Sequence, residues 1–148
     1  MTHDPRDIDE GLAALRRRLG ARAAGAWRVE GDRLVGLAFA TTDDMPPEVA
    51  GRFRAMSASV PLDLRDLGIV AAALDGRRRV SHAAELPPDA GSGLWLRAFA
   101  ADRSVAVPIA GAAGAVVGVV SVALVGAAAD DEVEDSLRRA ASGWFATG

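Results

Sequence analysis

Few side chains in this 148-residue sequence could carry out chemistry, and the cysteine count sets the first limit. The sequence contains no cysteine, which excludes disulfides, thiolate metal sites, thiol nucleophiles and thioether-linked chromophores. Its two histidines are His3, in a polar N-terminal tail, and His82 in the body of the chain. His82 could contact a ligand or serve as an axial haem ligand. Because no second histidine or cysteine completes a metal site, we expect His82 to be solvated or bonded to backbone.

Ser81 and His82 are neighbours in the sequence, as the members of a catalytic triad are in space. Successive side chains of a strand point to opposite faces of a sheet, so the serine could not pass its proton to the adjacent imidazole. No other arrangement of nucleophile and base is evident. We therefore expect a protein that is not an enzyme, with no catalytic residue, metal or resident cofactor.

The side chains best suited to binding come from separate stretches of the chain. The predicted ligand-binding set consists of Phe53, Met56, His82, Leu94, Trp95 and Phe99, with Arg97 and Arg103 as candidates for recognising an anionic ligand. The alternative is that the apolar residues belong to the hydrophobic core, because pocket walls and cores have the same composition. The two arginines would then be solvated, as most surface arginines are.

An uncharged run decides how these residues are positioned. Residues 104–129 read SVAVPIAGAAGAVVGVVSVALVGAAA and are long enough to cross a bilayer, with a small-residue pattern at Gly114 and Gly118 that suits packed membrane helices. Against a membrane helix stand Pro108, the recurring glycines and a composition of mainly alanine and valine. Valine-rich runs broken by glycine are typical of buried strands, and residues 111–114 suit a hairpin turn. The run therefore predicts two antiparallel strands, over residues 104–109 and 115–125.

Periodicity and turn residues predict the remaining elements. Residues 24–30 and 33–40 form a hairpin in which Val35, Leu37 and Phe39 share one face. The other predicted elements are helices over residues 7–19, 47–56, 67–74 and 94–99, an extended segment over 57–63, a short strand over 77–82, a loop over 83–92 that could act as a lid, and a final helix that opens at Asp130.

This order of elements, together with three stretches of sequence, resembles the GAF-domain family. Residues 60–80 read VPLDLRDLGIVAAALDGRRRV, similar to the family's extended segment, alanine-rich helix and short strand. Residues 104–109 read SVAVPI and residues 114–120 read GAVVGVV, which resemble two consecutive strands of that family. The likeness covers residues 8–146 of a single domain that spans residues 1–148.

The resemblance implies an α+β fold with a central antiparallel sheet of five to six strands. It places the terminal helices on one face and a ligand pocket, covered by short helices and loops, on the other. Such domains bind small molecules or chromophores and relay a signal to a partner or output module. The absence of cysteine excludes covalent bilin attachment. It also excludes the activity of the GAF-type free methionine sulfoxide reductases, which need several cysteines. With no lysine, the lysine-containing signature of the cyclic-nucleotide-binding branch is absent too.

Composition limits the partners and the location. The formal charge of −3 disfavours a nucleic-acid backbone. The polar, acidic first ten residues do not resemble a secretory leader, so we expect a cytoplasmic protein without a membrane anchor.

Two apolar helix stripes suggest a homodimer, since they offer more apolar surface than one sheet face can bury. The predicted dimer interface consists of Ile8, Leu12, Leu15, Leu19, Leu137, Trp144 and Phe145. A sensor of an unknown small molecule is thus the main hypothesis. A ligand-free dimerisation or protein-interaction module is the alternative, with a GAF-like or a Roadblock-like fold, although residues 46–74 exceed what a Roadblock-like scaffold contains.

Overall fold

The computed structural model describes residues 5–145, so His3 and the last residue of the predicted range 8–146 lie outside the described residues. Within them the elements follow the predicted order. They are α1 (Pro5–Leu19), β1 (Ala23–Glu30), β2 (Arg33–Thr41), α2 (Pro47–Ser57), β3 (Ser59–Pro61), α3 (Gly68–Asp75), β4 (Arg79–His82), the 3-10 turn η1 (Ala83–Glu85), α4 (Gly91–Ala98), β5 (Arg103–Ala110), β6 (Val116–Leu124) and α5 (Asp130–Ala141).

The uncharged run folds back on itself as a hairpin. Strands β5 and β6 pair antiparallel from Arg103 opposite Leu124 to Ala110 opposite Val116. In the turn, the Gly111 N–H donates to the carbonyl of Ala115 at 2.8 Å. The membrane-helix alternative is therefore wrong for these residues. No helix in the described part of the chain has the length and apolar character that crossing a bilayer requires.

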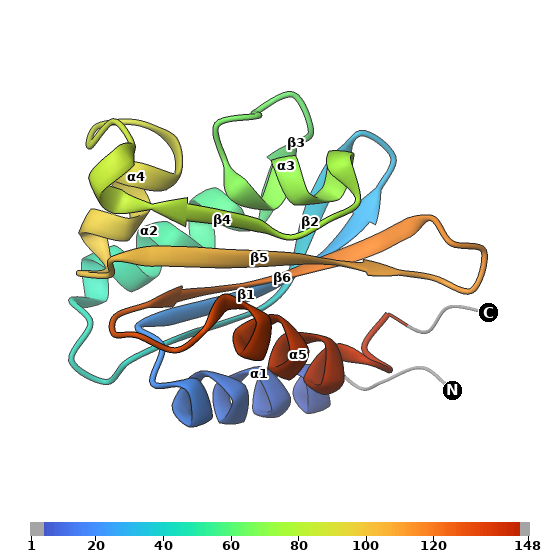
Figure 1. Cartoon of the computed structure of the whole chain (residues 1–148), viewed down its shortest axis with the longest axis horizontal. Helices are drawn as coiled ribbons and strands as arrows, with labels where there is room; N and C mark the ends of the chain where they lie inside the picture. Colours follow the sequence, from blue (N-terminus) through green and yellow to red (C-terminus); the bar gives the residue numbers. More distant parts are fainter. Residues whose placement is uncertain (1–4, 146–148) are drawn as a thin grey trace.

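The six strands form one antiparallel sheet in the order β3-β2-β1-β6-β5-β4. Figure 1 shows the sheet nearly edge-on, with α1 and α5 on one face and α3 and α4 on the other. Helix α2 packs on the same side as α3 and α4, because its Phe53 belongs to the same apolar cluster as Val70 and Leu96. The predicted α+β fold with an antiparallel sheet of five to six strands is confirmed.

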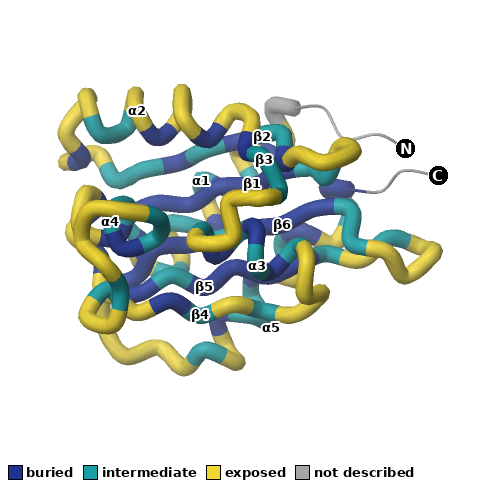
Figure 2. The backbone as a smooth tube through the Cα atoms, turned by 90° about the horizontal axis from the view of Figure 1, so that it is seen from above, coloured by how far each residue is buried: buried dark blue, intermediate teal, exposed yellow. Residues whose placement is uncertain are grey.

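The face under the terminal helices is a closed core, and this corrects the predicted dimer interface. Ile8, Leu12, Leu15, Leu137, Trp144 and Phe145 are all buried inside the chain, and Leu19 is half-buried against the same cluster. The tube coloured by burial shows the central strands β1, β5 and β6 as mostly buried (Figure 2). The six buried side chains therefore offer almost no apolar surface to a second copy, and Leu19 offers only part of its side chain.

Two glycines explain how the bulky C-terminal aromatics fit into this core. A Cβ added at Gly11 of α1 would lie 2.8 Å from the Trp144 ring, and one at Gly118 of β6 would lie 2.3 Å from the Phe145 ring. Each ring thus occupies space that only a glycine leaves free. The sequence stripes are the inner faces of two helices that cover each other and the sheet.

An irregularity in β2 reverses the alternation expected for that strand. Ala26 pairs with Ala38 but Trp27 pairs with Gly36, so the register shifts by one residue at Leu37. As in a β-bulge, the extra residue moves the following side chains to the other face. Leu37 therefore packs with the terminal-helix core and Phe39 with the opposite cluster. The prediction that Leu37 and Phe39 share a face is wrong.

Candidate ligand-binding site

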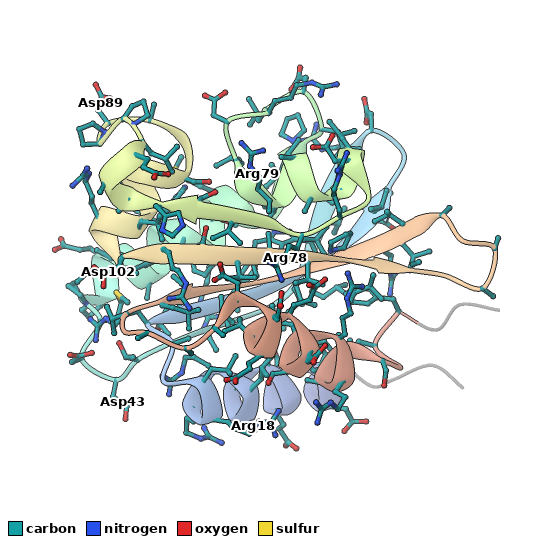
Figure 3. The ribbon with its side chains drawn as sticks, in the orientation of Figure 1. Arg18, Asp43, Arg78, Arg79, Asp89 and Asp102 are labelled. Carbon is teal, nitrogen blue, oxygen red and sulfur yellow. The ribbon has the colours of Figure 1, made fainter. Side chains whose placement is uncertain are left out.

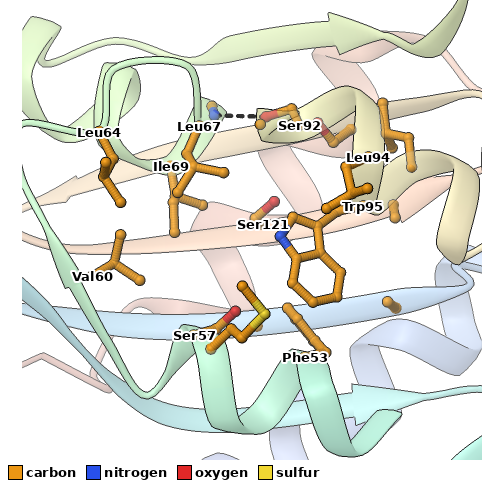
Figure 4. Close-up of a pocket in the computed structure, with 18 of the residues that line it drawn as sticks. Phe53, Ser57, Val60, Leu64, Leu67, Ile69, Ser92, Leu94, Trp95 and Ser121 are labelled. Atoms are coloured by element: carbon orange, nitrogen blue, oxygen red, sulfur yellow. Dashed lines mark hydrogen bonds between the residues drawn. The ribbon is translucent and has the colours of Figure 1, made fainter. Parts of the chain in front are cut away.

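A cavity of about 290 Å³ lies between the sheet and helices α2, α3 and α4 (Figure 4). Its floor comes from β1, β5 and β6, and its walls come from the three helices and residues 59–67. Met56 and Leu64 both line it, and they are 57% and 46% exposed. The cavity therefore reaches the molecular surface where these two side chains lie.

Aromatic rings form one wall of the cavity. Phe53 is buried at the centre of this wall, with its ring centroid 6.5 Å from Trp27, 5.1 Å from Phe39, 5.7 Å from Trp95 and 5.0 Å from Phe99. Three of these four contacts are edge-to-face, the arrangement that the charge distribution of aromatic rings favours. Interlocking rings hold the wall in one conformation.

The floor of the cavity is built from small side chains. Ala23 and Gly25 of β1, Ser104 of β5, and Ser121 and Ala123 of β6 all line it. In β5 and β6 the immediate neighbours of these residues point to the other face and are larger: the terminal-helix core contains Val105, Val107, Val120, Val122 and Leu124. These two strands thus alternate small and large residues, which leaves a hollow on one face of the sheet and a filled core on the other.

The opposite side of the cavity is closed where α3 and α4 meet. The backbone N–H of Gly68, at the start of α3, donates to the Ser92 hydroxyl at 2.9 Å. The backbone N–H of Ser92 in turn donates to the carbonyl of Asp66 at 3.3 Å. A Cβ at Gly91 would lie 2.8 Å from Asp66, so the two segments approach closely. The end of the 83–92 segment, predicted as a loop and lid, is thereby tied to α3.

The polarity of the lining limits what the cavity can hold. Asp66, an exposed residue, is the only charged residue among the lining residues, and no arginine is among them. The other polar groups are serine hydroxyls and the indole nitrogens of Trp27 and Trp95. Among residues 5–145 there is no cluster of three or more histidine, aspartate or glutamate side chains that could hold a metal ion. The cavity suits an uncharged, mainly apolar molecule.

Comparison with known proteins identifies the architecture. No protein-family model matches the sequence, and no curated protein matches it significantly. Solved structures do match the fold. The GAF domain/HD domain protein from Geobacter sulfurreducens is 15% identical, with a TM-score of 0.66 over 95% of this chain and 90% of that chain. The phycoerythrobilin-bound GAF domain from a cyanobacterial phytochrome is 12% identical, with a TM-score of 0.67 over 95% and 82%.

This chain has the GAF-domain fold. The structural neighbours also include an enzyme. The free methionine-R-sulfoxide reductase from Neisseria meningitidis, solved in complex with its substrate, is 17% identical, with a TM-score of 0.64 over 95% of this chain and 75% of that chain. At these identities the likeness establishes the fold, and function must be argued from the site.

Five residues of the predicted ligand-binding set line the cavity of this GAF fold. These are Phe53, Met56, Leu94, Trp95 and Phe99, which come from α2, α4 and the residue after α4. Their helical spacing predicts that the members of each group lie on one face of a helix. The structure shows that both helices pack on the same face of the sheet.

The three charged or titratable members of the predicted set lie outside the cavity lining. His82 is exposed at the end of β4, opposite Arg103 in the sheet register. Arg97 is exposed and donates to the carbonyl of Ala83 at 3.0 Å. Neither the haem-ligand hypothesis for His82 nor anion recognition by Arg97 has support from these positions.

Arg103 is buried for a structural reason, which corrects its predicted place in a ligand site. Its Nε donates to the Asp130 carboxylate at 3.1 Å and its Nη1 to the carbonyl of Gly126 at 2.9 Å, while Nη2 donates to the carbonyl of Ala128. All three partners lie in the segment that connects β6 to the first turn of α5. The guanidinium holds this connection against the sheet and has no donor directed into the cavity.

The floor residues, which the sequence argument missed, were visible in the sequence. Residues 104–107 read SVAV and residues 119–124 read VVSVAL, so serine or alanine alternates with valine or leucine. Both runs were interpreted only as strands buried on two faces. The size difference between the faces was the signal that one side is hollow.

Proposed function

We propose that this GAF-fold chain is a sensory domain that binds a small, uncharged and mainly apolar molecule non-covalently in its cavity. The observation that carries the proposal is the cavity of about 290 Å³, with aromatic walls, a floor of small side chains and no basic lining residue. An engineered apolar cavity of about 150 Å³ binds benzene. Nearly twice that volume accommodates a ligand of about ten heavy atoms, the size of two fused rings.

The proposed signal leaves the cavity through α3. Leu67, Gly68 and Ile69 line the cavity at the start of this short helix, which ends at Asp75. Arg78 lies three residues after the end of α3, and its side chain contacts α5 on the other face of the sheet (Figure 3).

Arg78 links the cavity side of the sheet to α5. Its Nη1 donates to the Glu134 carboxylate at 3.1 Å and also to the Asp131 carboxylate. Hydrogen bonding to Asp131 raises the pKa of Arg78, which further favours the charged form of the guanidinium. A ligand that shifts α3 would therefore shift the charge that two side chains of α5 contact. Helix α5 is in this proposal the element that a partner or output module reads.

The proposal does not include catalysis. The cavity lining contains no histidine and one carboxylate, Asp66, without a partner group that would make it a general acid or base. We also retain a cytoplasmic homodimer as a proposal, but the apolar stripes cannot form its interface. Most exposed residues of the terminal helices are charged: Arg17 and Arg18 end α1, and Asp131 and Glu132 open α5. A symmetric pair through these helices would join opposite charges.

Native mass spectrometry of gently purified protein tests the sensing proposal. We expect the wild-type protein to retain a small additional mass. Ser121→Leu fills the cavity floor and should abolish retention, whereas Ser142→Leu adds the same side chain at an exposed position and should not. Circular dichroism of both variants confirms that they fold. A wild-type protein that carries no additional mass, and binds no uncharged aromatic compound when titrated, would contradict sensing and favour the ligand-free interaction module.

A further inference from the structure

The cavity contains an indole N–H group for which the described chain provides no acceptor. Trp27 and Trp95 both line the cavity. The Trp27 Nε1–H donates to the carbonyl of Ser57 at 2.8 Å, which fixes the end of α2 against β1. Within residues 5–145 the Trp95 Nε1–H forms no hydrogen bond with the protein, and Figure 4 shows this nitrogen directed into the pocket, on the side of Ser121. A ligand in the cavity would meet an unsatisfied donor.

The packing of Trp95 fixes the direction of this donor. Its ring stacks on Phe99 with a centroid separation of 5.6 Å and an interplanar angle of 26°. It also packs against Phe53 at 5.7 Å and 57°. Because two rings hold the indole plane, little side-chain entropy is lost when the N–H group binds an acceptor. The donor is preorganised for a ligand atom at one place in the cavity.

The charge of the lining identifies the kind of acceptor. The only charged lining residue is Asp66, and no arginine lines the cavity. A carboxylate or phosphate would lose its hydration without meeting a positive charge, and it would lie near an acidic side chain. A carbonyl or ether oxygen accepts the same hydrogen bond at a far smaller desolvation penalty. The acceptor atom should therefore belong to an uncharged molecule.

We propose that Trp95 is the specificity-determining residue of the cavity: its indole N–H donates a hydrogen bond to the carbonyl or ether oxygen of an uncharged ligand about the size of two fused rings. This inference rests on the proposed sensing function and deepens it by naming the ligand class. The apolar rings of the ligand lie against Phe53 and Phe99, and its oxygen faces the Trp95 nitrogen. Molecules of the same shape without an acceptor bind more weakly.

The test uses two compounds with one carbon skeleton. 1-Tetralone and tetralin differ in a single carbonyl oxygen, and 2-naphthoate supplies an anion of similar size. Affinities are measured by calorimetry for the wild type, Trp95→Phe and Trp144→Phe. Phenylalanine keeps the aromatic contacts and removes the donor, and Trp144 lies in the core on the other face of the sheet. The ratio of the two affinities is compared between proteins, so the different water solubility of the compounds cancels.

We expect the preference for 1-tetralone over tetralin to fall about fivefold in Trp95→Phe, because a hydrogen bond contributes about 1 kcal/mol net. Trp144→Phe should keep the wild-type preference. In a ¹H–¹⁵N spectrum of the wild type, 1-tetralone should shift the Trp95 indole signal more than tetralin does. This second readout needs no variant.

Each alternative outcome decides a separate point. If both compounds bind but the preference is unchanged in Trp95→Phe and the indole signal does not move, this inference is wrong while sensing by the cavity stands. If 2-naphthoate binds more tightly than 1-tetralone, the uncharged ligand class is wrong. If none of the three compounds binds at millimolar concentration, both the inference and the proposed function fail.

Discussion

Replacing Arg103 with methionine distinguishes a structural arginine from a ligand-binding one. Arg103 is 8% exposed, and its guanidinium binds Asp130 and the carbonyls of Gly126 and Ala128. Methionine has a similar length and no charge, so the variant removes these hydrogen bonds without leaving a large void. The Asp130 carboxylate then loses its partner, and the β6–α5 connection loses its attachment to β5.

The expected loss of stability follows from the exposure of the partners. Removing one member of a fully buried ion pair costs about 3–5 kcal/mol. The Asp130 side chain is 33% exposed, and Gly126 and Ala128 are exposed residues, so water can replace part of what the guanidinium provides. We therefore expect Arg103→Met to lower the free energy of unfolding by about 2–3 kcal/mol. For a chain of this length that corresponds to a decrease in Tm of roughly 5–10 °C.

Urea denaturation followed by circular dichroism measures this loss, and Arg97→Met is the matched control. Arg97 is exposed and makes one hydrogen bond to a carbonyl, so its replacement should change stability by less than about 1 kcal/mol. Arg103→Lys keeps a charge but not the three-way geometry, and it should fall between wild type and Arg103→Met. Equal losses for Arg97→Met and Arg103→Met would refute the structural role of Arg103. Weaker retention of a ligand at unchanged stability would restore its predicted role in binding.

Three further predictions test other parts of the structure. Arg78→Ala should change the unfolding free energy only slightly, because its ion pairs are partly exposed. It should nevertheless speed amide hydrogen exchange in α5 if the cavity side and α5 are coupled. The Thr42 hydroxyl lowers the pKa of Asp44, so the stabilisation that the Asp44 carboxylate provides is present above its ordinary pKa and is lost as the pH falls. The difference in unfolding free energy between wild type and Asp44→Asn should therefore shrink below about pH 4. A difference that widens there would contradict this assignment. Gly118→Ala should cost about 1–3 kcal/mol because its Cβ meets an aromatic ring, whereas Gly51→Ala, on a helix with open space around it, should be neutral or stabilising in urea titrations.

The sequence predicted the elements well where glycine and proline mark their limits. The hairpin of β5 and β6 was inferred from Pro108 and the glycines at 111 and 114, and the turn lies where these glycines are. The prediction of which sheet face each side chain occupies was less successful, because side chains alternate between the two faces only in a regular strand. The register shift at Leu37 depends on how β1 and β2 pair, and no feature of residues 33–41 alone encodes it.

The other differences between the sequence-based predictions and the structure come from contacts between residues far apart in the chain. Arg103 looks like any surface arginine until its partners, 23 to 27 residues further along the chain, fold against it. The helix stripes likewise looked too apolar for a monomer, because their mutual burial depends on Gly11 and Gly118 admitting large rings. Apolar members of the candidate site were predictable, since spacing along a helix fixes which side chains point the same way.

The alternation of residue size in β5 and β6 connects stability to the proposed function. A dry void of about 290 Å³ would lower stability by about 7 kcal/mol at the cavity penalty measured for buried leucine replacements. Access to solvent and the hydroxyls of Ser104 and Ser121 reduce this penalty, because they let water enter. Water nevertheless finds few partners among the aromatic walls, so an apolar ligand gains by replacing it. The GAF fold described here is therefore expected to be measurably more stable with its cavity filled, by a ligand or by the leucine of Ser121→Leu.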